Sequence, residues 1–334
     1  MRLADFEYPL PDSKIAQIPV EPRDSARLLV DQGDRTAPLH RHVRDLTEFL
    51  GEGDLLVVND SRVIPARLRL RRDSGGAAEV LLLEQHDANV WEALVRPGKK
   101  VKPGETLYTE SGQPIAQMGV RTKAGDTFMV TLLSDDPFAL LEEHGEMPLP
   151  PYISAPLHEH ERYQTVYANE PGSAAAPTAG LHFTSELLHA LESRGVTVAK
   201  VQLVVGLDTF QPMSVENPLD HPIHSERYVV PADTMAHCRE ATRVIAVGTT
   251  ATRALESAAT FGELQGRTRL FIHRGYNWKV VDLMLTNFHL PRTTLLLMVE
   301  SFIGPRWRML YETALAENYR FLSFGDAMLL DRSL

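Results

Sequence analysis

The sequence predicts an α/β protein: a layered α/β sandwich with a mixed sheet, carrying a small inserted antiparallel β-barrel. Over most of the 334 residues, apolar runs of strand length alternate with segments of helical pattern, which is typical of such sandwiches. After Pro65 the pattern changes to short strands between Gly- and Pro-containing turns, which is typical of a small barrel. The Pro-rich run 147–151 marks the return to the first pattern. We therefore predict a discontinuous α/β domain, residues 1–65 and 148–334, and an inserted β-barrel domain, residues 66–147.

Strands are predicted where apolar residues run continuously or alternate between turn signals. The first lies at 55–58, directly before Asn59 and Asp60. The barrel strands are predicted at 66–70, 78–83, 90–95 and 127–132. After the insert, strands are predicted at 198–205, 244–247, 269–273, 280–285 and 295–299.

Two helix starts have clear local signals. Thr184 is expected to cap a helix that Gly195 ends, because a hydroxyl residue precedes a leucine-rich face and glycine follows it. The turn Gly248-Thr249-Thr250 follows a buried strand and is expected to open a second helix. Free N–H groups at such a start, beside two hydroxyls, favour a carboxylate or phosphate ligand. An ordinary helix start is the alternative.

Composition excludes several classes of protein. With 43% hydrophobic and 23% charged residues, the chain has the balance of an ordinary globular protein rather than a disordered one. The longest apolar run, 295–299, is far shorter than the roughly 20 residues that span a bilayer, and no signal peptide is evident. We therefore expect a cytoplasmic protein with no membrane partner. The single cysteine, Cys238, permits no disulfide or cysteine-based metal site within one chain.

Charge is unevenly distributed along the chain. The net charge of −10 argues against a general nucleic-acid coat, since phosphate binding needs cations. Residues 61–104 nevertheless hold nine basic and five acidic residues, which makes this segment +4 and the remainder −14. A solvated strand face and a phosphate-binding surface both explain the cluster.

Two histidines lie in similar uncharged turns, His182 within 177–184 and His289 within 286–291. Because imidazole titrates near neutrality, two such side chains in one pocket divide acid and base work. The alternative is that each histidine only forms hydrogen bonds within its own turn. In His158-Glu159-His160-Glu161 the spacing resembles that of metal ligands, but nothing nearby supplies a further ligand, so no metal is predicted.

Polar residues also follow several predicted strands, where α/β sheets bind ligands. Asn59 with Asp60, Asn287 with His289, and Ser323 with Asp326 are examples. The segment 162–167 mixes a cation, an amide and aromatic rings, which suits either a base-stacking surface or an amphipathic strand.

Long motifs in a fixed order cover essentially the whole chain. They include 59–68, 163–167, 172–184, 247–253 and 286–291. With these motifs the chain resembles the S-adenosylmethionine:tRNA ribosyltransferase-isomerases of the queuosine pathway. The resemblance implies an α/β main domain with an inserted barrel.

The resemblance also implies a reaction and partners. The ribosyl part of S-adenosylmethionine is transferred to 7-aminomethyl-7-deazaguanine at the tRNA wobble position and isomerised, which yields epoxyqueuosine-tRNA, adenine and methionine. S-adenosylmethionine is then a co-substrate, and we expect no bound prosthetic group. The tRNA anticodon stem-loop is the expected macromolecular partner, and a monomer is expected.

The resemblance places candidate residues for each role. The acid–base candidates are His182, His289, Asp326, Glu226 and His224; without the resemblance, His224 and Glu226 suggest only a surface ion pair. The candidates for binding S-adenosylmethionine and the acceptor base are Thr178, Phe183, Thr249, Thr250, Arg253, Asn287, Phe288, Asn59, Asp60, Arg62, Tyr163 and Gln164. The candidates for contacting the tRNA backbone are Arg67, Arg69, Arg71, Arg96, Lys99 and Lys100.

The chain departs from the family pattern at three places. Val204 and Asp208 stand where the pattern has His and Gly, and Arg274 stands where a Pro is usual. The loss of an imidazole and the gain of a carboxylate leave open which base accepts the ribosyl group. Two alternatives therefore stay open: the same sulfonium–ribosyl chemistry on another acceptor, and a catalytically silent RNA-binding protein.

Overall fold

The computed structural model describes residues 1–122, 125–157, 159–205, 212–223 and 225–334. The chain divides into two compact units. The α/β unit comprises Met1–Ser61, Pro151–Asn169 and Pro177–Leu334, and the barrel unit comprises Arg62–Pro150 and Glu170–Ala176. The predicted barrel domain, residues 66–147, is a few residues shorter at each end than the segment Arg62–Pro150 of the barrel unit. The segment 170–176 groups with the barrel unit because β12 (Glu170–Ser173) pairs with β4 (Ser61–Val63).

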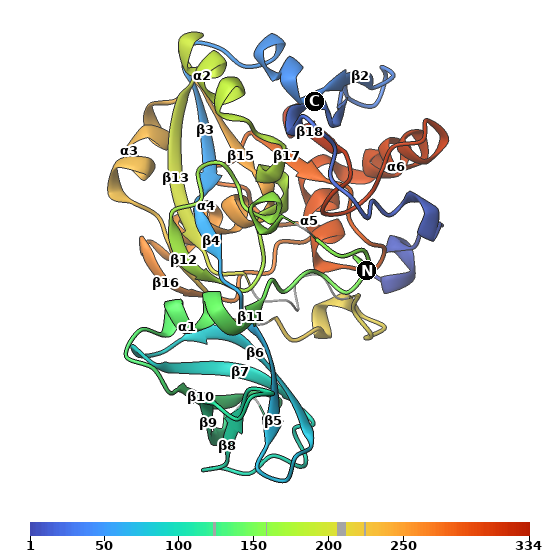
Figure 1. Cartoon of the computed structure of the whole chain (residues 1–334). Helices are drawn as coiled ribbons and strands as arrows, with labels where there is room; N and C mark the ends of the chain where they lie inside the picture. The colour runs from blue at the N-terminus through green and yellow to red at the C-terminus, as the bar shows by residue number, and fades with distance from the viewer. Residues whose placement is uncertain (123–124, 158, 206–211, 224) are drawn as a thin grey trace. The chain divides into compact units, whose positions relative to one another are not determined.

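The α/β unit is built on a nine-stranded mixed sheet (Figure 1). Its order is β16-β14-β13-β3-β15-β17-β18-β1-β2. The bounds, in that order, are Gln265–Thr268, Glu226–Val229, Thr197–Leu203, Asp54–Asn59, Arg243–Val247, Leu283–Asn287, Ala327–Asp331, Arg27–Val30 and Leu39–His42. The four central strands β13, β3, β15 and β17 run parallel, whereas β18 is antiparallel to β17. The predicted mixed sheet is confirmed.

Helical elements cover both faces of this sheet. Alternate strand residues such as Leu56, Val58 and Ile245 join one core with α2 (Ser185–Ser193) and η4 (Val43–Glu48). Helix α4 (Gly248–Phe261) contacts β3, β13, β15 and β17 but contributes nothing to that core, so it packs on the opposite face. The other α-helices of the unit are α3 (Ala232–Glu240), α5 (Thr294–Ile303) and α6 (Trp307–Ala316). Its 3-10 helices also include, within the described residues, η1 (Leu3–Phe6), η2 (Asp12–Lys14), η3 (Arg23–Ser25), η5 (His160–Tyr163), η6 (Thr178–His182), η8 (Pro218–Asp220) and η9 (Gly304–Arg306).

Both predicted helix starts are confirmed. The Thr184 hydroxyl accepts a hydrogen bond from the Leu187 N–H at 3.1 Å and caps α2, which gives way to a turn at Gly195 with φ +85°. Helix α4 begins at Gly248, whose φ of +86° is a conformation that favours glycine.

Two strand predictions are wrong. Residues 295–299 lie in α5, where the Thr293 hydroxyl caps the helix by accepting from the Leu296 N–H at 3.3 Å. A short run buried all round has no visible period, so pattern alone does not separate helix from strand. Residues 269–273 form no strand, because the edge strand β16 ends at Thr268, whose hydroxyl accepts from the Leu270 N–H.

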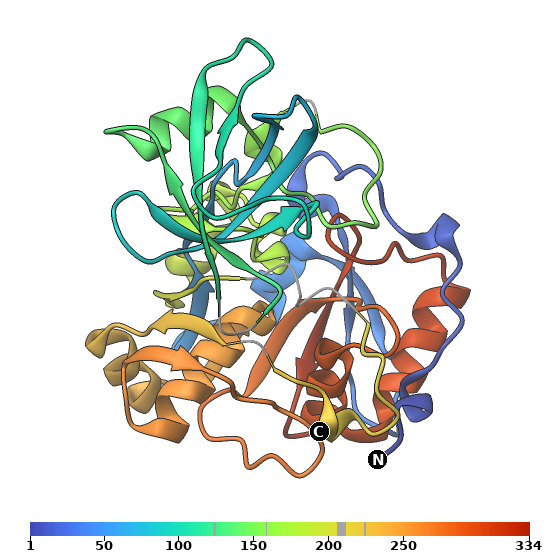
Figure 2. The same cartoon turned by 90° about the horizontal axis from the view of Figure 1, so that it is seen from below.

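The barrel unit is a closed six-stranded antiparallel barrel (Figure 2, cyan to green). Its order is β5-β6-β7-β10-β9-β8, closed by pairing of β8 with β5, and β11 joins β5. The bounds, in that order, are Arg67–Arg72, Ala77–Gln85, Val90–Arg96, Phe128–Leu132, Pro114–Arg121 and Thr106–Tyr108, with β11 at Gly145–Glu146 and α1 at Pro137–His144. The inserted antiparallel barrel is confirmed.

Within the described residues, none of the helices has both the length and the apolar character that a membrane span requires.

Candidate functional site

The carboxyl ends of the parallel strands bring the predicted polar residues to one edge of the sheet. Asn59 ends β3, Gly248 follows β15, and Asn287 ends β17. Asp326 joins them because it directly precedes the antiparallel strand β18. This gathering, predicted from the strand ends, is confirmed.

A pocket of about 400 Å³, which is partly open to solvent, lies at this edge. Thr249 and Thr250, at the start of α4, line it together with an ion pair between Arg253 Nη1 and Glu226 Oε2 at 2.5 Å. Both charged side chains are nearly buried, so the guanidinium is already engaged by a carboxylate. The rest of the lining is mostly apolar: Leu203, Ile223, Leu270, Phe271, Ile272, Thr294, Leu295 and Met298. We call this the Glu226 pocket.

The Thr250 hydroxyl is a further polar group of the Glu226 pocket. The side chain is 9% exposed, and its oxygen has no hydrogen-bond partner in the part of the chain that the structure describes. A buried hydroxyl without a partner costs free energy, so it is available to a ligand.

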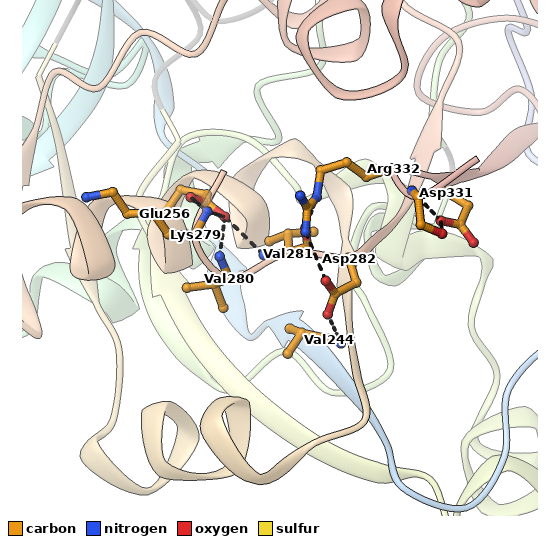
Figure 3. A network of polar contacts seen from close by, with 9 residues as sticks. Val244, Glu256, Lys279, Val280, Val281, Asp282, Asp331 and Arg332 are labelled. Carbon is orange, nitrogen blue, oxygen red and sulfur yellow. Dashed lines mark hydrogen bonds and ion pairs between the residues drawn. The ribbon is translucent and has the colours of Figure 1, made fainter. Parts of the chain in front are cut away.

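A buried carboxylate orders the chain that leads from this pocket into β17. Glu256 of α4 is fully buried and accepts hydrogen bonds from the N–H groups of Lys279, Val280 and Val281 at 3.0, 2.9 and 3.0 Å (Figure 3). It also accepts from the Tyr276 hydroxyl at 2.9 Å. Glu256 therefore fixes the segment between the pocket-lining residues 270–272 and β17, and the sequence did not single it out.

A second pocket, of about 250 Å³ and partly open to solvent, is lined by His182 with two arginines. Arg162 is the cation of the predicted segment 162–167, whereas the sequence did not single out Arg23 as a site residue. The other lining residues of this pocket are Pro19, Val20, Leu181, Ser323, Phe324 and Gly325. We call this the His182 pocket. The 3-10 helix η6, which carries His182, contacts both α4 and β17.

Hydrogen bonds define the state of His182. The Asn287 side chain accepts from the Thr178 hydroxyl through Oδ1 at 3.1 Å, and its Nδ2 donates to the Asp326 carbonyl at 3.5 Å. That amide orientation makes Nδ2 the donor to His182 Nε2 at 3.0 Å, so the proton of the neutral ring lies on Nδ1. Burial, aided by the charge of Arg320, lowers the His182 pKa to about 4. His182 is therefore a neutral hydrogen-bond donor at pH 7.

His289 is held differently and lines neither of these two pockets. Its Nε2 pairs with the Thr286 hydroxyl at 2.9 Å, and its main chain contacts the hydroxyls of Tyr8 and Tyr311. Burial lowers its pKa to about 3. The two imidazoles thus both form hydrogen bonds to the end of β17, through Asn287 and Thr286, but only His182 lines one of these pockets.

Asp326 acts on the backbone. Its two oxygens accept from the N–H groups of Arg27 at 3.0 Å and Arg320 at 2.8 Å, and the carboxylate is 2% exposed. Asn59 is likewise engaged by the protein, since its side chain donates to and accepts from the main chain of Leu203. Both residues organise the sheet edge.

The predicted aromatic residues pack in cores. Phe183 belongs to the core of the α/β unit, and Phe288 is fully buried among aromatic rings including Tyr311 and Phe321. Neither phenylalanine lines the two pockets described above. Tyr163 is also fully buried, edge-on to Phe324 of the His182 pocket.

The remaining predicted binding residues lie at three places. The Gln164 carbonyl accepts from Arg23 Nη1 at 2.5 Å beside the His182 pocket. Asp60 pairs with Lys200 at 3.8 Å beyond the end of β3. Arg62 belongs to the barrel unit, and His224 lies outside the described residues, as do His158 and Asp208.

The predicted phosphate contacts of the barrel unit differ in availability. Arg69 pairs with Glu146 and Arg71 with Glu110, at 2.9 and 2.6 Å. Arg67 is half-buried, whereas Arg96, Lys99 and Lys100 are exposed. The last three are therefore the cations of this set best placed to meet an external phosphate.

One group of metal-ligating side chains occurs among the described residues. In the barrel unit, Glu84, His86 and Glu92 place one ligand atom each within 4.8 Å of one another, and His86 Nε2 lies 3.4 Å from Glu92 Oε2. The sequence did not indicate this group, because Glu84 and Glu92 come together only through pairing of β6 with β7.

Two of the departures from the family pattern have visible surroundings. Arg274 donates to the buried carboxylate of Glu300, at 2.8 Å from its Nε. Val204 continues from β13, and its N–H donates to the Arg227 carbonyl at 3.0 Å.

Comparison with known proteins identifies the family. The model described as "Queuosine biosynthesis protein" matches residues 3–330. The S-adenosylmethionine:tRNA ribosyltransferase-isomerase of Symbiobacterium thermophilum is 49% identical over 341 residues, which cover 99% of this chain and 100% of the relative. That of Moorella thermoacetica is 48% identical over 342 residues, with coverage of 99% and 100%. The crystal structure of S-adenosylmethionine tRNA ribosyltransferase from Thermotoga maritima has a TM-score of 0.55 and 38% identity, and the match covers 97% of this chain and 99% of that one. The chain therefore belongs to the queuosine biosynthesis protein family.

Proposed function

We propose that this chain is an S-adenosylmethionine:tRNA ribosyltransferase-isomerase. It transfers the ribosyl group of S-adenosylmethionine to the aminomethyl group of 7-aminomethyl-7-deazaguanine at the tRNA wobble position and isomerises it. The products are epoxyqueuosine-tRNA, adenine and methionine. Full-length similarity to enzymes of that name supports the reaction. S-adenosylmethionine is its co-substrate.

The Glu226 pocket is the proposed site for S-adenosylmethionine. One observation carries this assignment: a buried Glu226–Arg253 ion pair and an unpartnered Thr250 hydroxyl line an otherwise mostly apolar pocket at the carboxyl edge of parallel strands. Apolar walls exclude water, and the few polar groups orient the ligand.

Glu226 is the proposed base. The positive sulfur of S-adenosylmethionine acidifies the adjacent C5′–H of the ribose, so a carboxylate removes that proton and holds it as a carboxylic acid. Among the described residues that line the pocket, Glu226 is the only carboxylate, and it forms an ion pair with Arg253. The Arg253 guanidinium also orients the Glu226 carboxylate, because a short ion pair limits the rotation of the carboxylate.

The two histidines receive different roles. His182 presents its Nδ1–H to a ligand oxygen or nitrogen as a neutral donor, because its Nε2 is engaged by Asn287. His289 is a positioning residue that holds the Thr286 hydroxyl at the end of β17. Asp326 positions Arg27 and Arg320 through their main chain.

The barrel unit is the proposed contact for the anticodon stem. Arg96, Lys99 and Lys100 are its exposed candidates for phosphate contacts. Each phosphate contact adds about 0.7–0.9 to the slope of log affinity against log salt.

The decisive experiment is incubation with S-adenosylmethionine and tRNA that carries the aminomethyl base, followed by measurement of free adenine and tRNA mass. The proposal predicts adenine release with a matching mass gain. Adenine without mass gain points to another acceptor, and bound tRNA without either signal points to a silent binder.

Glu226→Gln tests the assigned base. Loss of one acid–base group typically costs about 10²- to 10⁴-fold in turnover, and we expect a loss in that range. Glu312→Gln, an exposed position of α6, is the matched control. Unchanged turnover of Glu226→Gln at saturating substrates removes Glu226 from the proton transfer.

A further inference from the structure

We propose that the His182 pocket binds an anionic oxygen group, a carboxylate or a phosphate, through Arg23, Arg162 and the Nδ1–H of His182. This inference rests on the proposed function, because it assigns part of the substrate to a place separate from the Glu226 pocket. The ligand chemistry has two sources in that reaction: the methionine carboxylate of S-adenosylmethionine and a phosphate of the tRNA.

The first observation is the composition of the lining. Two arginines and a histidine line a pocket of about 250 Å³ that is partly open to solvent, and no carboxylate is among its lining residues in the described part of the chain. Charge-assisted hydrogen bonds from arginine to carboxylate or phosphate oxygens are the strongest polar contacts available to this pocket.

The second observation is the pairing of Arg23. Its Nη1 and Nη2 donate to the main-chain carbonyls of Gln164 and Glu161, at 2.5 and 2.9 Å, which orient the guanidinium without neutralising it. Burial and then the like charge of Arg162 lower its pKa, whereas Glu21 and Glu161 act in the opposite direction. Two partly buried guanidinium groups that repel each other are stabilised by an anion between them.

Arg162 is only partly neutralised. Its Nε pairs with Glu21 at 2.6 Å, but that carboxylate is 67% exposed and therefore well screened. Its Nη2 donates to the Val20 carbonyl at 2.9 Å. The pairing thus holds the Arg162 side chain in place and leaves positive potential at the pocket.

The third observation is the tautomer of His182. Asn287 donates to Nε2, so the hydrogen lies on Nδ1, and His182 is one of the residues that line the pocket. A ring N–H at the wall of a pocket can donate to an acceptor atom of a ligand. The hydroxyl of Ser323 is already shared with Tyr152 at 2.7 Å, so it supports the wall of the pocket.

By contrast, the Glu226 pocket is poorly suited to an anion. Its guanidinium, Arg253, already pairs with the buried carboxylate of Glu226 at 2.5 Å. An incoming carboxylate there would meet a like charge. The methionine carboxylate therefore fits the His182 pocket better than the helix start at Thr249 and Thr250, where the sequence favours a carboxylate or phosphate ligand.

The test measures equilibrium binding of three probes to the full chain: S-adenosylmethionine, 5′-methylthioadenosine, which lacks the carboxylate, and tRNA at several salt concentrations. The variants are Arg23→Gln, Arg162→Gln and Arg23→Lys, of which the last keeps the charge but loses the guanidinium fork. Arg44→Gln, an exposed cation that pairs with Asp24 at 3.6 Å, is the control for loss of one charge. Thermal unfolding of each variant identifies any that fails to fold.

If the pocket holds the methionine carboxylate, the two glutamine variants bind S-adenosylmethionine about 10- to 100-fold more weakly and 5′-methylthioadenosine unchanged. If it holds a phosphate, they bind S-adenosylmethionine normally, and their tRNA salt slope falls by about 0.7–0.9 each. In either case Arg23→Lys has a smaller effect than Arg23→Gln. Folded glutamine variants that bind all three probes like the parent chain overturn the proposal. Adenine release by the parent chain separates this outcome from failure of the proposed function.

Discussion

The buried carboxylate of Glu256 is predicted to be a major source of stability for the α/β unit. It accepts four hydrogen bonds: one from the Tyr276 hydroxyl and three from consecutive main-chain N–H groups, 279 to 281 (Figure 3). In Glu256→Gln, one oxygen can still accept from the N–H groups of Val280 and Val281. The new amide NH₂ then faces the Lys279 N–H and the Tyr276 hydroxyl. The hydroxyl can rotate to accept from the NH₂, whereas the partly buried Lys279 N–H loses its nearest acceptor.

An unsatisfied buried donor costs about 1–3 kcal/mol, so we take about 2 kcal/mol for this change. For a domain of this size, each kcal/mol corresponds to about 2–4 °C in the midpoint of thermal unfolding, so a fall of about 4–8 °C is expected. Hydrogen exchange at the amides of 279–281 should accelerate as well, because their acceptor is weakened. Glu312→Gln makes the same chemical change on the exposed face of α6 and is expected to shift the midpoint by no more than about 1–2 °C. If Glu256→Gln matches this control in both midpoint and exchange, the assigned hydrogen-bond network is wrong.

Three further predictions concern packing, pH and salt. Gly180→Ala should lower the free energy of unfolding by about 1–3 kcal/mol, because an ideal Cβ would lie 2.1 Å from the Tyr167 hydroxyl. In the same denaturation assay Gly51→Ala is the control and should be near neutral, because a Cβ there has nothing within 4 Å. Burial lowers the His182 pKa to about 4 in the folded state, whereas the pKa in the unfolded state is about 6.5. Between these two pH values only the unfolded state takes up the proton, so the free energy of unfolding falls by about 1.4 kcal/mol for each pH unit of acidification. His182→Asn should therefore unfold with a shallower pH dependence in that window, and an unchanged slope contradicts the shift. Lys99→Gln should lower the tRNA salt slope by about 0.7–0.9 without changing S-adenosylmethionine binding, and an unchanged slope removes Lys99 from the phosphate contacts.

Local signals explain which parts of the fold were predictable. Helix starts at Thr184 and Gly248 depend on a cap or a turn within a few residues, and both are where the sequence places them. The inserted barrel was visible because short strands between turn residues differ from their surroundings over many residues. The helix α5 was mistaken for a strand at 295–299 because a run that is apolar on every side has no period to measure.

The candidate site was predictable only in outline. The order of parallel strands brings Asn59, Gly248 and Asn287 to one edge, and strand ends can be recognised in a sequence. Whether a side chain at that edge faces a ligand depends on what packs against it. Asn59 and Asp326 look like ligand-binding residues in the sequence, yet main-chain groups occupy their polar atoms.

The sequence by itself therefore determined the family, the mixed sheet with its inserted barrel and the edge at which polar residues gather. The tertiary structure alone decided that Arg23 and Arg162 join His182, that the His289 ring is held by Thr286, and that Phe183 and Phe288 are buried in cores. The physical reason is that a pocket is assembled from residues far apart in the chain. The pKa and hydrogen-bonding capacity of each residue there are set by its burial and by those distant neighbours, which local sequence patterns do not encode.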